Sequence, residues 1–586
     1  MSITKYQKYC VCIFIAASFL LLWKLDYASL WNPDEGRYAS ASLEMAKALP
    51  GEKSSWLIPH LNTLPRLNKP PLVYWITATS YRIFGVHEWS GRLTTALASI
   101  GILALLWWMA VAIWGRDDGS KKAFFAMLVW VTAVVPFALS RLLNTDMLLT
   151  FATTLILVAI WRTAEEKPSW KAFAAAAIGL GLALLAKGPV GIALPLLVVL
   201  VWLGMVHKKY FYRYFVEHKF AILSTFIVGI AIAAPWYLAV NAARPGFLSH
   251  FIFVENLGRF SGEKAYHKPT SVFYYLPILL IGFIPWTFCL VPAAANYWKE
   301  RFQSTSQSRA RLFLWVWALL IVLFFSVSST KLITYILPAL PAFALLLGDA
   351  VAEYRLPTKA WKFALNANAV LMALLGILLI ALPHLKFANK IADVPAFQSS
   401  FTIGGIVLLA GALAMLIRMR IPRAQILAQS GTALLFVFVL PFIVGSVAPY
   451  EDISHVVQRL APQLSPNTQI VQYDTFQPSL IYYTRRPVTV IHQENTSGYN
   501  AQEYQQSPLF LEKYSSIETV LKTSKPVLVL VRWKMANTLA LRSLNYWGGN
   551  NDFALLSNRP APKGWPIEYI APAKRGQATF HHADAK

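Results

Sequence analysis

Carboxylates, a cation and aromatic rings stand close together in one short segment of this chain, "WNPDEGRYA" at residues 31–39. Asp34, Glu35 and Arg37 follow soon after an apolar run, residues 9–25, that the sequence predicts to enter a membrane. A carboxylate can accept a proton or bind sugar hydroxyls, and a guanidinium binds phosphate oxygens through two N–H groups. Since aromatic faces suit sugar rings and prenyl chains, the segment favours a ligand with phosphate, sugar or prenyl groups.

Other charged residues lie in segments that the predicted topology places on the same outer side of the membrane. They are Lys69 in "RLNKPPLVYW", Asp146 in "RLLNTDM", Lys187 between two spans, Arg259 and His267 in "FVENLGRFSGEKAYHKP", and Lys331, with rings from Tyr38, Tyr74, Trp75, Tyr274 and Tyr275. A charge at the bilayer centre costs about 2.5–3.5 kcal/mol on insertion scales, so several converging charges need a reason. We therefore predict one outer cavity that these side chains share.

Each of these residues also has an ordinary explanation when it is taken alone. Arg37 or Lys69 could extend its charge to lipid headgroups, and Lys187 could be structural at a tight turn. His267 could be a loop histidine with satisfied hydrogen bonds, and Asp146 could cap the helix that it begins. The occurrence of all of them on one face favours a binding site over five separate explanations.

The composition is that of a helical membrane protein with many spans. Of 586 residues, 56% are hydrophobic and 14% are charged, whereas soluble chains carry about 25% charged residues. Basic cytoplasmic loops explain the net charge of +25, so we expect no nucleic acid as a partner. Cys10, Cys12 and Cys289 all fall inside apolar runs, which argues against disulfides and cysteine-bound metals.

Apolar runs predict about thirteen transmembrane helices, each near the length that a bilayer core of about 30 Å requires. Their ranges are 9–25, 92–114, 122–140, 145–163, 171–186, 189–206, 220–240, 275–296, 310–327, 333–350, 362–382, 401–418 and 429–446. The apolar segment 70–85 is short and interrupted, and we predict that it is a helix lying at the membrane interface. With the N-terminus inside, every predicted inner loop is basic, and the odd span number leaves the tail on the outer side.

The C-terminal tail differs in pattern from the spans. "TQIVQYD", "RPVTVIHQ" and "KPVLVLVRW" predict strands, and "PSLIYYTRR" and "SSIETVLKT" predict helices. We therefore expect residues 1–449 to form a transmembrane catalytic domain whose outer loops, 26–91 and 241–274, form the active site. Residues 450–586 are expected to form a small soluble α/β domain on the outer side.

Six motifs resemble those of a known family and occur in the same order. They are "WNPDEGRYA", "NKPPLVYW", "NTDMLLTF", "LAKGPVGIALP", "VENLGRFSGEKAYHKP" and "STKLITYILPALPA". In these motifs the chain is similar to the bacterial aminoarabinose-transferase type of GT-C glycosyltransferase, which is related to the protein O-mannosyltransferases. The resemblance implies a multi-pass enzyme of the bacterial inner membrane whose site faces the periplasm. It also implies inverting transfer of 4-amino-4-deoxy-L-arabinose, or a similar sugar, from a polyprenyl-phosphate donor to a lipid A phosphate.

The resemblance also implies roles for individual residues. Asp34 matches the catalytic acidic residue and Asp146 a second functional aspartate, and Glu35 is a further catalytic candidate beside Asp34. Arg37, Lys69 and Arg259 match cations that hold the donor phosphate. Further substrate-binding candidates are Tyr38, Tyr74, His267, Lys187 and Lys331.

Two positions depart from the family pattern and bear on metal binding. Asn68 stands where the aminoarabinose enzymes typically have an acidic residue, and Asn256 stands where the residue after "VE" is often histidine. Because asparagine is a poor ligand for zinc, we predict no bound zinc there, and we expect no cofactor. The same two changes leave the identity of the sugar open.

Alternatives stay open on the sequence alone. An enzyme of the same fold could glycosylate a protein or a cell-envelope glycan instead of lipid A. A lipid-linked sugar flippase or transporter would usually place charges near the midplane and often carries an inverted repeat, and none is visible in this sequence. We expect a monomer surrounded by membrane lipids. Asp34 could act as general base toward a hydroxyl acceptor, or only orient an acceptor phosphate that is already ionised.

Overall fold

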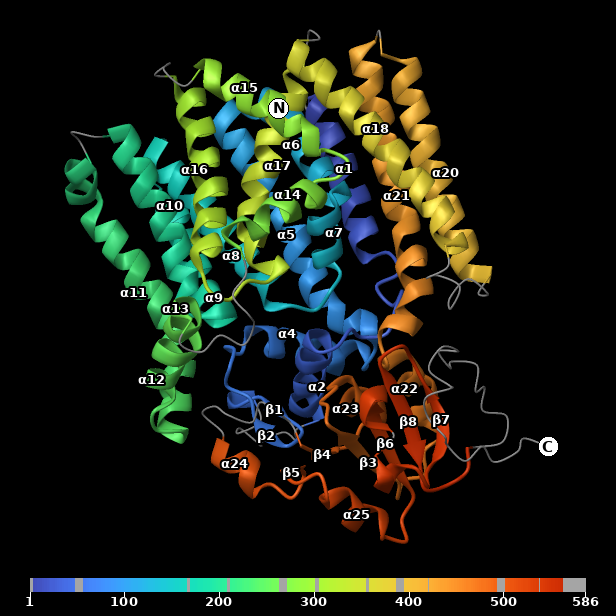
Figure 1. The fold of residues 1–586 in the computed structure, drawn as a ribbon. Helices are drawn as coiled ribbons and strands as arrows, with labels where there is room; N and C mark the ends of the chain where they lie inside the picture. The colour runs from blue at the N-terminus through green and yellow to red at the C-terminus, as the bar shows by residue number, and fades with distance from the viewer. Residues whose placement is uncertain are drawn as a thin grey trace.

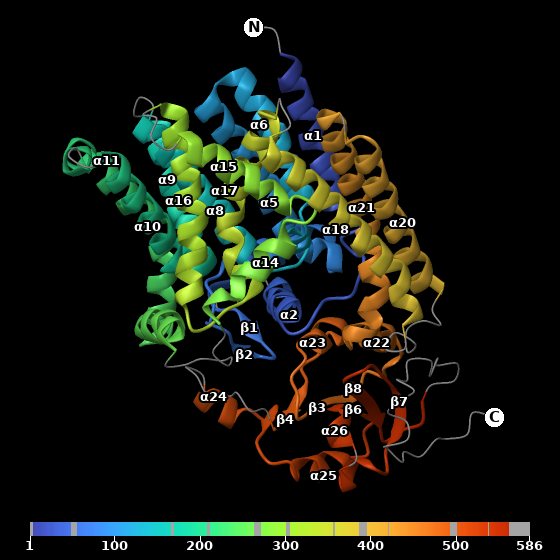
Figure 2. The same cartoon turned by 45° about the horizontal axis from the view of Figure 1, so that its top comes forward.

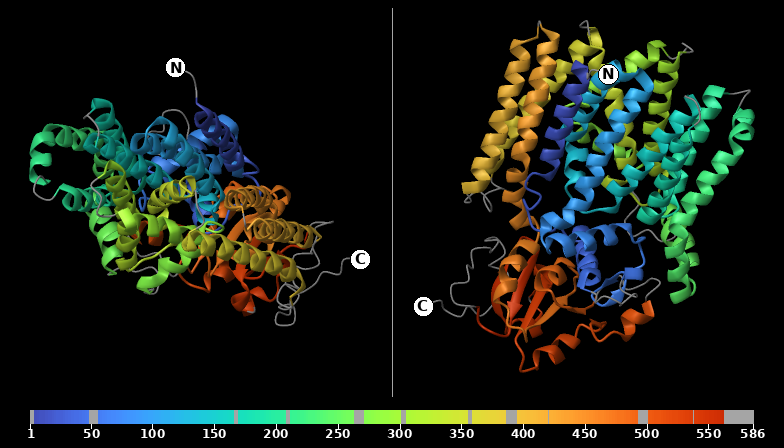
Figure 3. Two further views of the ribbon diagram at one scale, coloured as in Figure 1. Left: turned by 90° about the horizontal axis from the view of Figure 1, so that it is seen from above. Right: turned by 180° about the vertical axis from the view of Figure 1, so that it is seen from behind.

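Long helices form a bundle, and a small domain with a β-sheet lies against one end of it (Figure 1). The computed structural model describes residues 4–47, 56–165, 169–207, 211–262, 271–300, 305–354, 358–385, 395–419, 421–492, 501–536 and 538–561. Seen from behind, the segment that contains α2 (Asp34–Lys47) and α4 (Leu72–Phe84) lies between the bundle and the sheet domain (Figure 3). The first outer loop therefore forms a layer between the two parts.

The part of the chain that the structure describes contains ten helices long and apolar enough to cross a membrane. They are α1 (Lys5–Leu22), α5 (Glu88–Trp114), α8 (Thr145–Glu165), α9 (Trp170–Lys187), α11 (Phe211–Ala243), α16 (Ser306–Val327), η5 (Ile333–Ala339) continued by α17 (Leu340–Ala352), α18 (Lys359–Ala381), α20 (Pro395–Ile417) and α21 (Pro422–Glu451). The chain is a multi-pass membrane protein, and the predicted helical fold class is confirmed.

The remaining predicted spans correspond to broken or shorter helices. One bent pair is α6 (Arg116–Thr132) with α7 (Val134–Ser140), which meet at 70°. The other, bent by 109°, joins η3 (Val272–Tyr274) and α14 (Tyr275–Gly282) to η4 (Thr287–Cys289) and α15 (Leu290–Glu300). The shorter apolar helix is α10 (Val190–His207). The two breaks contact one another, because the N–H of Val134 donates to the carbonyl of Ile284 at 3.3 Å.

Helix α4 contains only 13 residues, which span about 20 Å at 1.5 Å per residue and fall short of a bilayer core. It packs against α2 and α5 at the end of the bundle. The short apolar segment that the sequence singled out is thus a helix of the intermediate layer and is not among the candidate spans.

The sheet of the C-terminal region has six strands in the order β5-β4-β3-β6-β8-β7. Strands β3 (Gln469–Tyr473), β4 (Thr489–Ile491), β5 (Phe510–Leu511) and β6 (Val527–Arg532) are parallel. Strand β8 (Phe553–Ser557) pairs antiparallel with both β6 and β7 (Asn545–Gly549). The register pairs Gln469 with Val527 and Val471 with Thr489. Five of the six residues of β6 are buried, as its continuous apolar run requires of a central parallel strand.

The predicted strands of the tail are β3, β4 and β6, and the predicted helices are α23 (Ser479–Thr484) and α25 (Ser516–Leu521). Strands β7 and β8 were missed for a local reason. The sequence "NYWGG" ends in two glycines and "FALLS" is rich in helix formers, so only pairing with β6 makes them strands.

Two short helices join the sheet to the rest of the molecule. Helix α22 (Ser454–Leu460) follows the last span, and α23 packs against both α22 and α2. Figure 2 shows α23 beside α2, at the face of the sheet domain that meets the bundle. Contacts between α2 and α23 therefore link the motif at residues 31–39 to the C-terminal domain.

Candidate active site

Asp34 begins α2 at the junction between the bundle and the C-terminal domain. Its carboxylate is 61% exposed, and Arg37 Nη1 lies 3.2 Å from Asp34 Oδ1, one helical turn away. A carboxylate in the first turn is favoured by the helix dipole, so the position suits the charge without burying it. Asp34 is thus held loosely and is open to a ligand.

A second arginine lies close to this pair. Burial lowers the pKa of the Arg37 guanidinium, the positive charge of Arg66 lowers it further, and Asp34 opposes both effects. Like charges are held side by side only at a cost, and an anion between them would relieve it. The positive charges of Arg37 and Arg66 therefore act on one another, which suits an anionic ligand.

Two buried tyrosines, Tyr38 of α2 and Tyr74 of α4, pack against one another beside the motif at residues 31–39. The rings of Tyr38 and Tyr74 lie 5.9 Å apart at 46°, and the side chains are 7% and 0% exposed. Burial raises the pKa of both hydroxyls. The charges of Asp34 and Asp146 raise the pKa of Tyr38 further. Tyr38 therefore lies within electrostatic reach of both predicted catalytic aspartates and keeps its proton as a donor.

Asp146 lies in the first turn of α8, and its side chain is buried. The ammonium group of Lys187, at the end of α9, forms an ion pair with its carboxylate. The same ammonium lies over the ring of Tyr335, 4.1 Å from the centroid. Asn144, not Asp146, accepts the capping hydrogen bond from the N–H of Met147 at 2.8 Å. Asn144 therefore provides the side-chain cap of α8, while Asp146 stands in the first turn, where the helix dipole favours its charge, and is paired with Lys187.

Lys69 is half-buried immediately before α4, in the segment that contacts the second outer loop. Its neighbour Asn68 donates from Nδ2 to Glu255 Oε1 at 3.4 Å, and Glu255 belongs to the π-helix η2 (His250–Gly258). Arg259 begins α13 (Arg259–Ser261) directly after η2, but its side chain lies outside the described part of the structure. His267 also falls outside the described residues.

Lys331 is buried near the start of η5, where its ammonium donates to the carbonyl of Ser328 at 2.7 Å. Tyr335 lies one turn further on, under Lys187. Lys331 therefore stands on the element that covers the ion pair of Asp146.

Asn68 and Asn256, the two positions that depart from the family pattern, are hydrogen-bond donors. Asn68 Nδ2 donates to Glu255, and Asn256 Nδ2 donates to the carbonyl of Phe251 at 2.7 Å. A metal ligand must instead present a lone pair, so these two amides do not fit a zinc site. Among the residues that the structure describes, no group of three or more His, Cys, Asp or Glu side chains could hold a metal ion.

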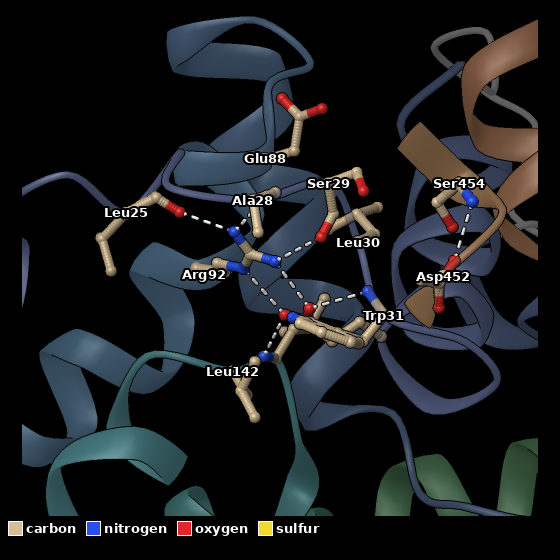
Figure 4. A network of polar contacts seen from close by, with 12 residues as sticks. Leu25, Ala28, Ser29, Leu30, Trp31, Glu88, Arg92, Leu142, Asp452 and Ser454 are labelled. Carbon is tan, nitrogen blue, oxygen red and sulfur yellow. Dashed lines mark hydrogen bonds and ion pairs between the residues drawn. The ribbon is translucent and has the colours of Figure 1, made fainter. Parts of the chain in front are cut away.

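The Glu35 carboxylate is buried, whereas that of its neighbour Asp34 is exposed. Glu35 is 3% exposed, and Arg92 of α5 binds it through Nε at 2.9 Å and Nη2 at 2.7 Å. The N–H groups of Trp31 and Leu143 donate to the same carboxylate at 3.0 and 2.8 Å. Figure 4 shows Arg92 at the centre of this network. We therefore remove Glu35 from the catalytic candidates, because four donors already occupy its carboxylate in the interior.

Two arginines of this region, Arg66 and Arg92, were missed in the sequence. Arg92 donates further to the carbonyls of Leu25, Ala28 and Ser29. Arg66 stands three residues before Lys69 in a quoted motif, which could have drawn attention to it, whereas Arg92 carries no such signal because its partners are distant in sequence. Arg141, which begins the quoted motif "RLLNTDM", donates to four carbonyls at the end of α1.

Comparisons with known proteins agree with this geometry. The family described as dolichyl-phosphate-mannose-protein mannosyltransferase matches residues 68–238. An undecaprenyl phosphate-α-4-amino-4-deoxy-L-arabinose arabinosyl transferase of Aeromonas hydrophila is 30% identical over 375 residues, which are 63% of this chain and 64% of the relative. This chain thus spans just under two thirds of that relative's length. The enzyme of that name from Edwardsiella ictaluri is 30% identical over 458 residues, which are 75% of this chain and 78% of the relative.

A solved structure shares the fold. It is the crystal structure of ArnT from Cupriavidus metallidurans bound to undecaprenyl phosphate, with a TM-score of 0.78 and 23% identity, covering 94% of this chain and 99% of that one. The chain therefore belongs to the aminoarabinose-transferase family of GT-C glycosyltransferases, whose relatives are named undecaprenyl phosphate-α-4-amino-4-deoxy-L-arabinose arabinosyl transferases.

Proposed function

We propose that this protein transfers 4-amino-4-deoxy-L-arabinose from undecaprenyl phosphate to a lipid A phosphate at the periplasmic face of the inner membrane. The observation that carries the proposal is the exposed carboxylate of Asp34 with Arg37 3.2 Å away, at the end of a transmembrane bundle and within the field of Arg66. Membership of a family whose relatives are named for this donor supports the choice of sugar and lipid. A prenyl tail in the bilayer would hold the reacting sugar–phosphate bond at this level.

In the proposed reaction, breaking the sugar–phosphate bond concentrates negative charge on the departing polyprenyl phosphate. Arg37 and Arg66 bind that phosphate, and Lys69 and Arg259 complete the cationic side of the site. An electrostatic donor of this kind contributes about 10²–10³ in rate. The acceptor attacks from the face opposite the leaving phosphate, so the anomeric carbon inverts.

Asp34 acts on the acceptor side of this reaction. Toward a lipid A phosphate, which is already ionised, it orients the acceptor or the sugar and need not remove a proton. Toward a hydroxyl it would serve as general base. The Tyr38 and Tyr74 rings form an apolar wall for the sugar or the first prenyl units, and their protonated hydroxyls are available as donors.

Asp146, Lys187, Lys331 and His267 complete the proposed substrate site. Asp146 and Lys187 form a buried ion pair next to Tyr335. The charges of both Asp34 and Asp146 act on the hydroxyl group of Tyr38. We assign this pair to the sugar, because a carboxylate can bind both its hydroxyls and its amino group. Lys331 supports the pair from η5, and His267 is retained from the motif alone.

The proposed orientation places the first outer loop, residues 26–91, and the C-terminal domain, residues 450–586, both in the periplasm. Asn32 of the loop and Asp452 of the domain are hydrogen-bonded at 2.6 Å, so the two segments occupy one side of the membrane. The basic loops on the opposite side assign that other side to the cytoplasm. The proposed enzyme acts as a monomer that contains its whole site within one chain.

The test is transfer by purified protein in proteoliposomes that contain the lipid-linked aminoarabinose and lipid A. Mass spectrometry of lipid A should show the mass of one aminosugar added only when both substrates and the protein are present. Hydrolysis or transfer to a protein or glycan, without modified lipid A, would favour the same fold with another acceptor. Movement of intact donor between leaflets without transfer would favour a flippase and overturn the proposal.

A further inference from the structure

We infer that the C-terminal domain positions Asp34 for the reaction through Asn32, and that Asn32 is a positioning residue which itself touches no substrate. The inference rests on the proposed function, because it concerns how the catalytic carboxylate of that reaction is held. The C-terminal domain would then contribute to catalysis, because the residue that it contacts, Asn32, lies two residues before Asp34.

Asn32 forms a polar node with three side chains of the C-terminal region. Its N–H donates to Asp452 Oδ2 at 2.6 Å, and its amide Nδ2 lies 3.0 Å from Asp452 Oδ1. The same Nδ2 lies 2.8 Å from Ser454 Oγ and 2.7 Å from Ser479 Oγ, and the N–H of Ser479 donates to Asn32 Oδ1 at 3.1 Å. Asp452, Ser454 and Ser479 are all buried. Asn32 is thus bound at its backbone and at both ends of its amide.

Gly36 provides an independent sign that this contact is tight. A Cβ added at Gly36 would lie 2.7 Å from Asn32 Oδ1 and 2.8 Å from the backbone nitrogen of Ser479. Neither distance is tolerated by real side chains, and a backbone atom cannot swing away. The glycine of "DEGR" therefore allows α2 to approach the node closely.

The bundle holds the other side of Asp34. Glu35 is bound by Arg92, and the N–H groups of Trp31 and Leu143 close the same carboxylate (Figure 4). Asp34 therefore lies between one anchor to the C-terminal domain, at Asn32, and one anchor to the bundle, at Glu35. Its own side chain remains 61% exposed, so the anchors fix the backbone and leave the carboxylate free to meet a substrate.

The size of the expected effect follows from this geometry. Reactive groups must be held within about 0.5 Å, and a displacement of about 1 Å can cost about 10² in rate. Loss of the Asn32 node would let the backbone of Asp34 move while leaving Arg66 and Lys69, which lie on another segment, in place. We therefore expect Asn32→Ala to lower kcat by about 10–100-fold, with the Kd for undecaprenyl phosphate changed by less than about threefold.

The matched control is Asn62→Gly. Asn62 also joins the C-terminal domain by a buried amide, since its Nδ2 lies 2.8 Å from the carbonyl of Val488 and its Oδ1 accepts from the N–H of Val488 at 2.8 Å. Its φ of 57° makes glycine the tolerated truncation. This variant loosens the docking of the domain away from Asp34, so its kcat should stay within about threefold of the wild type.

The decisive experiment is a double-mutant cycle on the full-length protein in proteoliposomes, with kcat, donor Kd and melting temperature measured for each variant. If Asn32 acts through Asp34, Asn32→Ala should lower the residual rate of Asp34→Asn by less than about threefold, because the group that it positions is already lost. Full additivity, or an equal loss in Asn62→Gly, would overturn the inference in favour of a general docking role. Wild-type kcat in Asn32→Ala would overturn it outright.

A second variant covers the case in which Asn32→Ala does not fold. Asp452→Asn keeps the size of the partner and removes only its charge and one acceptor, and we expect it to lower kcat about 3–10-fold without a change in donor Kd. Unchanged kcat would count against the inference. Full activity of Asp34→Asn would remove Asp34 from the proposed reaction, and that outcome is separate from a failure of Asn32 alone.

Discussion

The two ends of the transmembrane bundle each gather charged side chains, but they pair them to different extents. At the end away from the C-terminal domain, Lys122 of α6 lies 3.0, 2.7 and 2.8 Å from Asp118, Asp349 and Glu353. Arg311 of α16 binds Asp349 and Glu353 at 2.7 and 2.8 Å. Lys122, Arg311 and Asp349 are 1%, 3% and 4% exposed. In this cluster each charged group is paired with one of opposite sign, and the pairs tie α6, α16 and α17 together.

The end that faces the C-terminal domain also buries two ion pairs, Glu35 with Arg92 and Asp146 with Lys187, but it keeps a further pair exposed. Asp34 is 61% exposed with its ion-pair contact at 3.2 Å, and the pKa of Arg37 is lowered by burial first and then by the positive charge of Arg66. Buried ions must be paired because an isolated charge in the interior costs several kcal/mol. A site for an anionic substrate must instead keep some of its charge available to the substrate. The comparison teaches that incomplete pairing, more than the number of charges, separates a binding site from a structural clamp.

The largest expected effect concerns Asp34, at the end of the bundle that faces the C-terminal domain. Asp34→Asn keeps the size of the side chain but removes its charge, and we expect transfer to fall by about 10² or more. Donor binding and the melting temperature should be nearly unchanged, because the carboxylate is exposed. Turnover is measured with lipid-linked aminoarabinose and lipid A. Near-normal turnover in a folded protein would move the catalytic assignment to Asp146.

The next effect concerns the buried cluster of Lys122, Arg311 and Asp349, at the end away from the C-terminal domain. Asp349→Ala leaves Lys122 and Arg311 with less buried negative charge, and removing one partner of a buried pair costs about 3–5 kcal/mol. We expect a large drop in unfolding free energy in detergent, with donor Kd unchanged in the fraction that remains folded. A stability equal to that of the wild type would contradict the reading of this cluster as a clamp.

A smaller effect is expected at Arg66. Arg66→Ala should weaken binding of undecaprenyl phosphate and reduce transfer by about 10², because one donor to the leaving phosphate is lost. Arg82→Ala is the matched control, since Arg82 lies on α4 and uses its Nε to bind the carbonyl of Ala46. Equal losses in the two variants would show a general effect of charge on the outer face.

The smallest expected effect is the change in unfolding free energy when the ion pair between Arg37 and Asp34 is removed. The ion pair between Arg37 and Asp34 is exposed, and such pairs contribute about 0.2–1 kcal/mol. Arg37→Ala should therefore change the unfolding free energy by less than about 1 kcal/mol while weakening donor binding. Chemical denaturation and lipid binding are measured on the same preparation. A stability loss as large as that of Asp349→Ala would make the two ends alike.

The apolar helices, the short helix at residues 72–84 and three strands of the tail could be predicted because they depend on local patterns. Apolar runs of about 20 residues have few alternatives to a membrane helix, and a short buried run such as "VLVLV" has few alternatives to a strand. Strands β7 and β8 depend on partners, so their local sequence was uninformative. Asp34, Arg37 and Asp146 were predicted as site residues because unusual residue types in quoted motifs marked them.

The sequence by itself determined that this chain is a multi-pass membrane protein with charged motifs toward one side, because hydropathy and loop charge act locally. Only the tertiary structure decided between adjacent residues of one motif. Asp34 and Glu35 are both carboxylates one residue apart, yet Glu35 meets Arg92 from a distant helix and is buried, while Asp34 points away from that partner and stays exposed. Their roles differ because the cost of burying a charge is removed only by a partner, and the partner comes from a segment 57 residues away.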